Sequence, residues 1–238
     1  MKTDPRNSYN TREADSGQSY YYESRYSQPI FYRRREARFS TTELLNLLVA
    51  SGLIVLLSIS LVYQDFPIIN LNNFDYVSVL LLAVILLITF LPHELMHKIL
   101  AQRYGLFAEF RIIPSYALLT LIILFIPYSF RIFAPGAVMI AGQATPEAYG
   151  KTSAAGPATN VVVGVAMLGL GFALPIFSLF FFLGAYFCGW IALFNMIPLG
   201  PLDGGKVLHW SKTGFAALLV SSLWLFIVGA LFAYGILP

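Results

Sequence analysis

Two histidines and a glutamate near residue 95 have the types and spacing of a metal site. His93 and His97 stand four residues apart in a mostly apolar stretch, and Glu94 follows the first histidine directly. A helix turns once in about 3.6 residues, so both imidazoles would project from one face and could bind one metal ion. In this H-E-x-x-H pattern the glutamate lies beside the metal without binding it. In a soluble surface helix the pattern is more often incidental, so its interpretation depends on the surrounding sequence.

A carboxylate about a hundred residues later could complete the site. Asp203 closes another apolar stretch and is followed by two glycines. A catalytic zinc ion commonly has three protein ligands and keeps a fourth position for water. We therefore expect His93, His97 and Asp203 to bind one zinc ion per chain, with Glu94 as the base that takes a proton from the bound water. The alternative role for Asp203 is to cap a helix.

The composition is that of an integral membrane protein. Of the 238 residues, 58% are hydrophobic and 11% are charged, whereas an ordinary soluble domain has roughly 25% charged residues. The net charge is only +3, and no basic patch predicts binding to nucleic acid. The single cysteine, Cys188, excludes an internal disulfide. Its apolar surroundings predict a packed thiol.

The first 40 residues differ from the rest of the chain. Residues 1–40 are rich in Ser, Tyr, Arg, Gln and Glu and have no apolar period, so they would bury too little surface to offset their chain entropy. We expect a disordered cytoplasmic tail over residues 1–40 and a membrane-embedded domain over residues 41–238. A cleavable signal peptide is not expected, because the first apolar stretch begins only near Leu44.

Five segments are long enough to cross a hydrocarbon core of about 30 Å. The predicted fold is an all-α polytopic membrane protein with about five to six transmembrane helices and a short membrane-associated strand or re-entrant region. Arginines precede the first segment, while the 64–75 connection has no Lys or Arg. The positive-inside rule then places the N-terminus in the cytoplasm and His93 near the cytoplasmic face of the plasma membrane. The segments are residues 43–63, 76–102, 155–176, 178–198 and 213–236.

Glu94 is the one charged residue between Asp75 and Lys98. A charge within a bilayer costs about 2.5–3.5 kcal/mol on insertion scales, so we expect this residue to have a function. The alternative is an ion pair with a lysine or arginine on a neighbouring helix. The other apolar segments offer almost no such partner.

A further apolar stretch, residues 116–130, is short for a span. If it crossed the membrane, the later spans would invert and Asp203 would lie on the opposite side from His93 and His97. We therefore expect a re-entrant or surface-lying segment. Residues 134–140 contain a Pro-Gly break and β-branched residues, which predict an extended strand or loop beside the catalytic cleft.

Residues 195–206 contain two prolines and three glycines, so they cannot form an uninterrupted helix. Irregular backbone at membrane depth is tolerated where it lines a water-filled cavity, and hydrolysis within a membrane needs such a cavity. Asn195 is placed to donate an amide hydrogen bond toward it, with interhelical packing as the alternative. His209 is expected to lie at the interface rather than to act as a fourth ligand.

Three motifs together resemble the site-2 proteases. They occupy residues 93–97, 155–160 and 194–206, and their order and approximate spacing agree with that family from about residue 76 to 210. The resemblance implies an intramembrane zinc metalloprotease that cuts transmembrane segments of other proteins. By position, it implies that His93, His97 and Asp203 are the zinc ligands, that Glu94 is the general base, that Asn195 orients substrate or stabilises the oxyanion, and that Asn160 supports packing.

The chain departs from that family in one region and lacks an optional domain. Compact members lead directly into a glycine-containing strand where this chain has the 116–130 stretch. No segment is long enough for an inserted peptide-binding domain, so the chain is similar to the compact archaeal and bacterial members. Substrate selection would then depend on the membrane core, the tail or a partner protein. The expected partners are transmembrane protein substrates and the lipid bilayer, without nucleic acid; no oligomeric state is predicted.

Three other functions fit parts of the pattern. Zinc proteases of the prenyl-protein processing type share the histidine motif but use a glutamate as third ligand, and Asp203 fits that set less well. A non-catalytic zinc-binding scaffold that captures transmembrane helices is the main alternative, although loss of Glu94 or of a ligand would have favoured it. A metal transporter fits poorly, because no other span has the acidic residues or histidines of a permeation path.

Overall fold

The computed structural model describes residues 39–63, 75–124 and 135–237. The expected tail over residues 1–40 therefore lies outside the described residues, apart from its last two. The same holds for most of the 64–75 connection and for residues 125–130 of the short apolar stretch. The predictions for these parts, and the division into a tail and a membrane domain, stay predictions.

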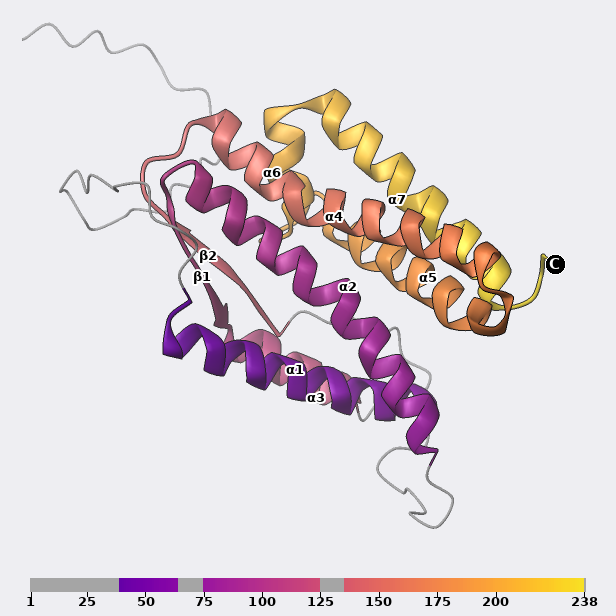
Figure 1. The fold of residues 1–238 in the computed structure, drawn as a ribbon. Helices are drawn as coiled ribbons and strands as arrows, with labels where there is room; N and C mark the ends of the chain where they lie inside the picture. The colour runs from indigo at the N-terminus through magenta and orange to yellow at the C-terminus, as the bar shows by residue number, and fades with distance from the viewer. Residues whose placement is uncertain (1–38, 64–74, 125–134, 238) are drawn as a thin grey trace, which may run out of the picture. The chain divides into compact units, whose positions relative to one another are not determined.

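Five helices in the described chain are long and apolar enough to cross a membrane, which confirms the predicted fold class (Figure 1). They are α1 (Thr41–Val62), α2 (Tyr76–Arg103), α4 (Pro146–Ala173), α5 (Ser178–Asn195) and α7 (Lys212–Ala233). The shorter elements are β1 (Phe107–Ile112), α3 (Pro114–Leu124), β2 (Gly136–Ala141), the 3-10 turn η2 (Pro175–Phe177) and α6 (Asp203–Trp210).

Polar caps set where several helices begin. The side chains of Ser40, Thr145 and Ser211 each accept a hydrogen bond from the backbone N–H three residues later, at 3.0, 3.1 and 3.0 Å. Such caps satisfy donors that the first helical turn leaves unpaired. The span expected over residues 155–176 lies mostly within a longer helix, because α4 begins at Pro146 directly after its cap and ends at Ala173. The polar residues of its first turns hid the helix from a search for apolar runs.

β1 and β2 form an antiparallel two-stranded sheet, and α3 lies in the connection between them. Ile112 pairs with Gly136 at the end of the ladder. The pairing continues one step further, because the Ile113 N–H donates to the Pro135 carbonyl at 3.1 Å. The connection therefore leaves the sheet and returns to it at the same place. Residues 125–130 of the predicted re-entrant segment lie outside the described residues, so that prediction stays a prediction.

The strand β2 confirms the extended segment expected over residues 134–140, whereas β1 was not predicted. β1 follows α2 through a turn in which Gly105 has φ 76°, a left-handed conformation that glycine adopts without strain. α3 then packs beside α1. The Ser60 hydroxyl donates to the carbonyl of Leu124 at 2.8 Å, and Leu124 shares a buried apolar cluster with Ile54.

Glycines allow α4, α5 and α7 to approach one another closely. A Cβ atom on Gly164 would lie 2.3 Å from Leu225 Cδ2, and one on Gly189 would lie 2.4 Å from the backbone nitrogen of Phe226. Small residues are typical of helix interfaces in membranes, where packing rather than water drives association. Cys188 is buried and free in this interface, which confirms the predicted packed thiol.

Candidate metal centre

The structure brings His93, His97 and Asp203 together, as the sequence predicted. Asp203 Oδ2 lies 3.6 Å from His93 Nε2 and 3.1 Å from His97 Nε2. Ligand atoms held by tetrahedral zinc at about 2.1 Å lie roughly 3.4 Å from one another. All three side chains are buried, and their ligand atoms lie within 4.8 Å of one another. Their spacing therefore suits one zinc ion.

The backbone of α4 fixes which nitrogen His97 can offer to a metal. His97 Nδ1 lies 2.8 Å from the carbonyl oxygen of Thr152. A carbonyl can only accept a hydrogen bond, so Nδ1 carries the proton and Nε2 keeps its lone pair toward Asp203. Metal-binding histidines commonly have such an outer partner, which holds the ring in the orientation that binding needs.

Asp203 reaches the histidines because α6 begins directly against the end of α5. A Cβ atom on Gly204 would lie 2.2 Å from the carbonyl oxygen of Met196, so only glycine allows this approach. Gly200, with φ 57°, turns the intervening chain. Asp203 is the first residue of α6, and its carboxylate faces the histidines. Leu202 occupies the cap position, so the capping role considered for Asp203 is not the one it has.

The two oxygens of Asp203 have different neighbours. Oδ2 faces the histidines, while Lys206 Nζ lies 3.5 Å from Oδ1. Burial alone would raise the pKa of the Asp203 carboxyl, but while the histidines are protonated and no metal ion is bound, the charge on His97, hydrogen bonds from His93 and His97, and Lys206 hold it below its usual range. The carboxylate is therefore ionised. Because Lys206 lies beside Oδ1, the other oxygen, Oδ2, is the one that can bind a cation together with the histidines.

Gly156 of α4 closes the third side of the group. A Cβ atom at this position would lie 2.2 Å from His97 Nε2 and 2.6 Å from His93 Nε2. Both atoms are the ones that would bind a metal, so the bare backbone of Gly156 passes directly beside the site. Thr152 and Gly156 are four residues apart and therefore share one face of α4.

Glu94 lies beside the ligand group and does not belong to it. It follows His93 by one residue, so its side chain leaves α2 in a different direction. Glu94 is half-buried, and its carboxylate lies beside the backbone of Val138 in β2 and interacts electrostatically with His97 and Asp203. Glu94 therefore lies near both the ligand group and the sheet.

Among the described residues, no strand pairs with the second edge of β2, here called the open edge, and Glu94 lies on that side. In an antiparallel pair, the backbone groups of successive residues point alternately toward the partner strand and away from it. Phe110 directs its N–H and C=O toward α1, where Glu43 Oε1 accepts at 3.0 Å and Asn46 Nδ2 donates at 3.4 Å. Phe110 pairs with Val138. The backbone groups of Val138 therefore also point away from the ladder, on the side where Glu94 lies.

Asn195 is the last residue of α5, and its predicted role is not visible in its contacts. Its amide Nδ2 donates to the carbonyl of Ile191 at 2.9 Å, within the same helix. Within the described part of the chain, no hydrogen bond joins Asn195 to the ligand group. Asn160 is fully buried, as a packing role requires, and His209 is exposed, as expected of an interfacial residue.

Sequence reasoning did not find the residues that support the ligands. Thr152 and Val138 contact His97 and Glu94 through backbone groups, and Lys206 contacts Asp203 through a flexible side chain. Their residue types therefore do not indicate from the sequence that they lie at the site. Gly156 appeared only as part of a motif. Its signal was a glycine directly before a proline inside an otherwise helical apolar stretch, where a close contact is a common reason for glycine.

Comparison with known proteins agrees with this geometry. The chain is 32% identical over 178 residues to the protein named "Putative zinc metalloprotease" from Methanocaldococcus jannaschii, and the match covers 73% of this chain and 87% of that protein. No family model matches the chain. No solved structure matches it.

Proposed function

Because the chain belongs to a family of zinc metalloproteases, we propose that it is an intramembrane protease of the site-2 type. It would hydrolyse peptide bonds within transmembrane segments of substrate proteins. One observation carries this proposal: the buried group of His93, His97 and Asp203 lies among helices that are long and apolar enough to cross a membrane. A site in that position meets substrates that are themselves in the bilayer.

The side chains of the centre divide the reaction between them. A bound zinc ion polarises a carbonyl group and lowers the pKa of its water to about 7. His93 and His97 would hold the ion through Nε2 and Asp203 through Oδ2. Glu94 would take a proton from the attacking water and pass it to the leaving amine. Asn195 can assist the developing oxyanion once its amide turns away from Ile191.

The open edge of β2 offers a place for the substrate. A transmembrane helix hides its carbonyls in its own hydrogen bonds, so the substrate must unwind before it is cut. An unwound segment could pair with β2 by strand addition, which satisfies its backbone groups within the membrane. The edge runs past Glu94, since Val138 contacts that carboxylate. Strand addition would therefore bring a substrate peptide bond beside the base.

We place the centre near the cytoplasmic face of the plasma membrane. Basic residues stand at the helix ends that meet around the centre, and such residues favour the cytoplasmic side. Lys206 lies 6.0 Å from the ring of Tyr149 in the first turn of α4, and Trp210 contacts the same turn. An impermeant thiol reagent should label a cysteine placed at Lys212 from the cytoplasmic side only. Labelling from the outer side would contradict this orientation.

Cleavage by purified protein tests the proposal. Wild-type protein and Glu94→Gln would be reconstituted in liposomes with a panel of single-span reporter proteins, and bound zinc would be measured in both. We expect zinc in both proteins and cuts within the spans by the wild type. Loss of a general base typically costs about 100- to 10,000-fold in rate. Glu147→Gln, an exposed glutamate on α4, is the matched control and should cut normally.

The other outcomes separate the alternatives. Zinc binding without cleavage across a broad panel would contradict the protease and favour the non-catalytic scaffold that captures transmembrane helices. Equal cleavage by Glu94→Gln would contradict the role of Glu94. A folded protein that binds no zinc would refute the shared site of His93, His97 and Asp203.

A further inference from the structure

A buried ion pair lies next to the metal ligands. Lys98, the residue after His97, is 1% exposed, and its ammonium pairs with the carboxylate of Glu43 in α1, which is fully buried. The ring of Phe39 lies 3.8 Å from the ammonium. Burying two charges costs desolvation free energy that is recovered only when further hydrogen bonds complete the pair. The second carboxylate oxygen of Glu43 makes such a bond.

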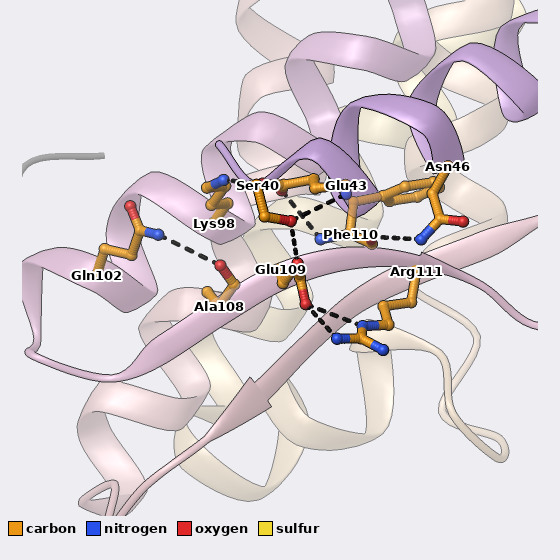
Figure 2. Close-up of polar contacts among 9 residues, drawn as sticks. All are labelled: Ser40, Glu43, Asn46, Lys98, Gln102, Ala108, Glu109, Phe110 and Arg111. Carbon is orange, nitrogen blue, oxygen red and sulfur yellow. Dashed lines mark hydrogen bonds and ion pairs between the residues drawn. The ribbon is translucent and has the colours of Figure 1, made fainter. Parts of the chain in front are cut away.

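That second bond attaches α1 to the backbone of β1 (Figure 2). Glu43 Oε1 accepts from the Phe110 N–H at 3.0 Å, and Asn46 Nδ2, three residues further along α1, donates to the Phe110 carbonyl at 3.4 Å. Gln102 of α2 donates to the carbonyl of Ala108 at 3.2 Å. Side chains thus occupy the edge of β1 where another strand would otherwise pair.

The two edges of the sheet are therefore unequal. On the edge of β1, the backbone groups of Phe110 are bonded to α1, whereas β2 directs those of Val138 toward Glu94. A substrate strand can add only at β2. The position of β2 depends in turn on β1, because the two strands form one ladder. Any displacement of β1 from α1 would move the open edge relative to Glu94.

Lys98 connects this arrangement to the metal centre. It lies on the same turn of α2 as His97, so one rigid segment of helix carries a ligand and one end of the buried ion pair. The contacts run from Lys98 through Glu43 to Phe110, and the ladder continues to Val138. This chain of contacts links the open edge of β2 to the segment of α2 that carries His97.

We propose that Glu43, Lys98 and Asn46, here called the β1 anchor, are positioning residues that set which peptide bond of a bound substrate is cut. Among the described contacts, Glu43 bonds to Lys98 and Phe110 and Asn46 bonds to Phe110, and neither Glu43 nor Asn46 bonds to the ligands or to Glu94. They act by holding the Phe110 backbone, and through it the register of β2 against Glu94. The inference rests on the proposed protease function and adds to it the residues that determine which peptide bond is cut.

Two double variants distinguish positioning from simple stabilisation. Glu43→Leu/Lys98→Met removes both buried charges and leaves the Phe110 N–H without its acceptor. Glu43→Gln/Lys98→Met removes the same charges but keeps an amide oxygen that can accept from Phe110. If the ion pair only stabilised the fold, both variants would behave alike. If the anchor positions β1, the glutamine variant should be rescued.

The experiment uses zinc-loaded protein in liposomes and a single-span reporter that the wild type cuts. Mass spectrometry identifies the bond that is cut, zinc content and helical circular dichroism confirm the centre and fold, and hydrogen exchange reports on residues 107–112 and 136–141. The control is Glu147→Gln/Lys151→Met, which removes an exposed ion pair on α4. It should cut at the wild-type bond.

For the leucine variant we expect normal zinc content, faster exchange in both strands, and new cut positions. Cutting at the wild-type bond should fall by about 100-fold, the order of loss expected from a 1 Å misplacement of reacting groups. The glutamine variant should cut at the wild-type bond. An unchanged cut position in the leucine variant, or equal changes in both double variants, would overturn the anchor proposal alone. A wild type that cuts no reporter would refute the protease function itself.

Discussion

Replacing Gly156 by alanine places one methyl group against the two nitrogens that would bind zinc. The new Cβ atom would lie 2.2 Å from His97 Nε2 and 2.6 Å from His93 Nε2, whereas ordinary van der Waals contacts begin near 3.4 Å. Relieving the first contact needs a movement of 3.4 minus 2.2, or about 1.2 Å. Zinc–ligand distances vary by only about 0.2 Å, so a centre displaced by that amount no longer fits the ion.

The expected loss follows from the cost of overpacking. An extra methyl group in a well-packed interior typically costs about 1–3 kcal/mol. If the zinc-bound form carries that cost, the affinity falls by about 5- to 150-fold, since each 1.4 kcal/mol is a factor of ten. Alanine favours a helix over glycine by about 1 kcal/mol, so the helix itself should not be weakened. The defect should therefore appear in metal binding before it appears in folding.

A chelator competition measures this effect. Purified protein in detergent is titrated against a zinc chelator of known affinity, and helical circular dichroism is recorded on the same samples. Gly169→Ala is the matched control, because it changes the same helix at a position where no other described part of the chain lies within 4 Å of the new Cβ. It should bind zinc like the wild type. A folded Gly156→Ala protein with unchanged zinc affinity would refute the placement of α4 beside the ligands.

Three further outcomes are expected. Val138→Pro removes the N–H that Val138 presents at the open edge, while the ladder bonds of neighbouring residues remain. Reporter cleavage should therefore fall at least about 10-fold at unchanged zinc content. Intact cleavage would contradict strand addition. Lys98→Met alone leaves the Glu43 carboxylate buried without its cation. It should lower the free energy of unfolding by about 3–5 kcal/mol in a denaturant titration. A loss below about 1 kcal/mol would contradict the burial of this ion pair. The hydrogen bond from Ser40, and after it the charge and hydrogen bonds of Arg111, hold the pKa of Glu109 below its usual range despite burial. Ionised Glu109 therefore stabilises the folded protein fully above about pH 4.3, and this contribution to the free energy of unfolding is lost as the pH falls further. Thermal unfolding between pH 6 and about pH 3 should show this loss in the wild type and less of it in Glu109→Gln.

The ligand set could be predicted because it depends on short-range rules. The spacing of His93 and His97 determines that they share a helix face. The side on which Asp203 emerges was predicted from the number of crossings, and the structure brings Asp203 to the two histidines. The relative's name then agrees with zinc as the metal.

The supporting contacts could not be predicted, because they join residues that are far apart in sequence. Glu43 and Lys98 each stand near the end of an apolar segment, where a charge normally indicates the membrane interface. Only the packing of α1 against α2 buries them as a pair. β1 was missed for a similar reason: its glutamate and arginine look like a surface loop until Ser40 and the neighbouring arginine are seen to pair with Glu109.

Because of the hydrogen bond between Ile113 and Pro135, the length of the connection between these two residues does not affect the direction of the helices that follow it. Because the two ends of this excursion meet, residues between them can be added, deleted or exchanged without reversing α4, α5 or α7. Asp203 would still arrive on the side where His97 lies. The excursion with α3 is therefore a natural graft point, at which evolution or an engineer could vary the contacts of α1 with lipid and neighbouring helices while the metal centre stays in place.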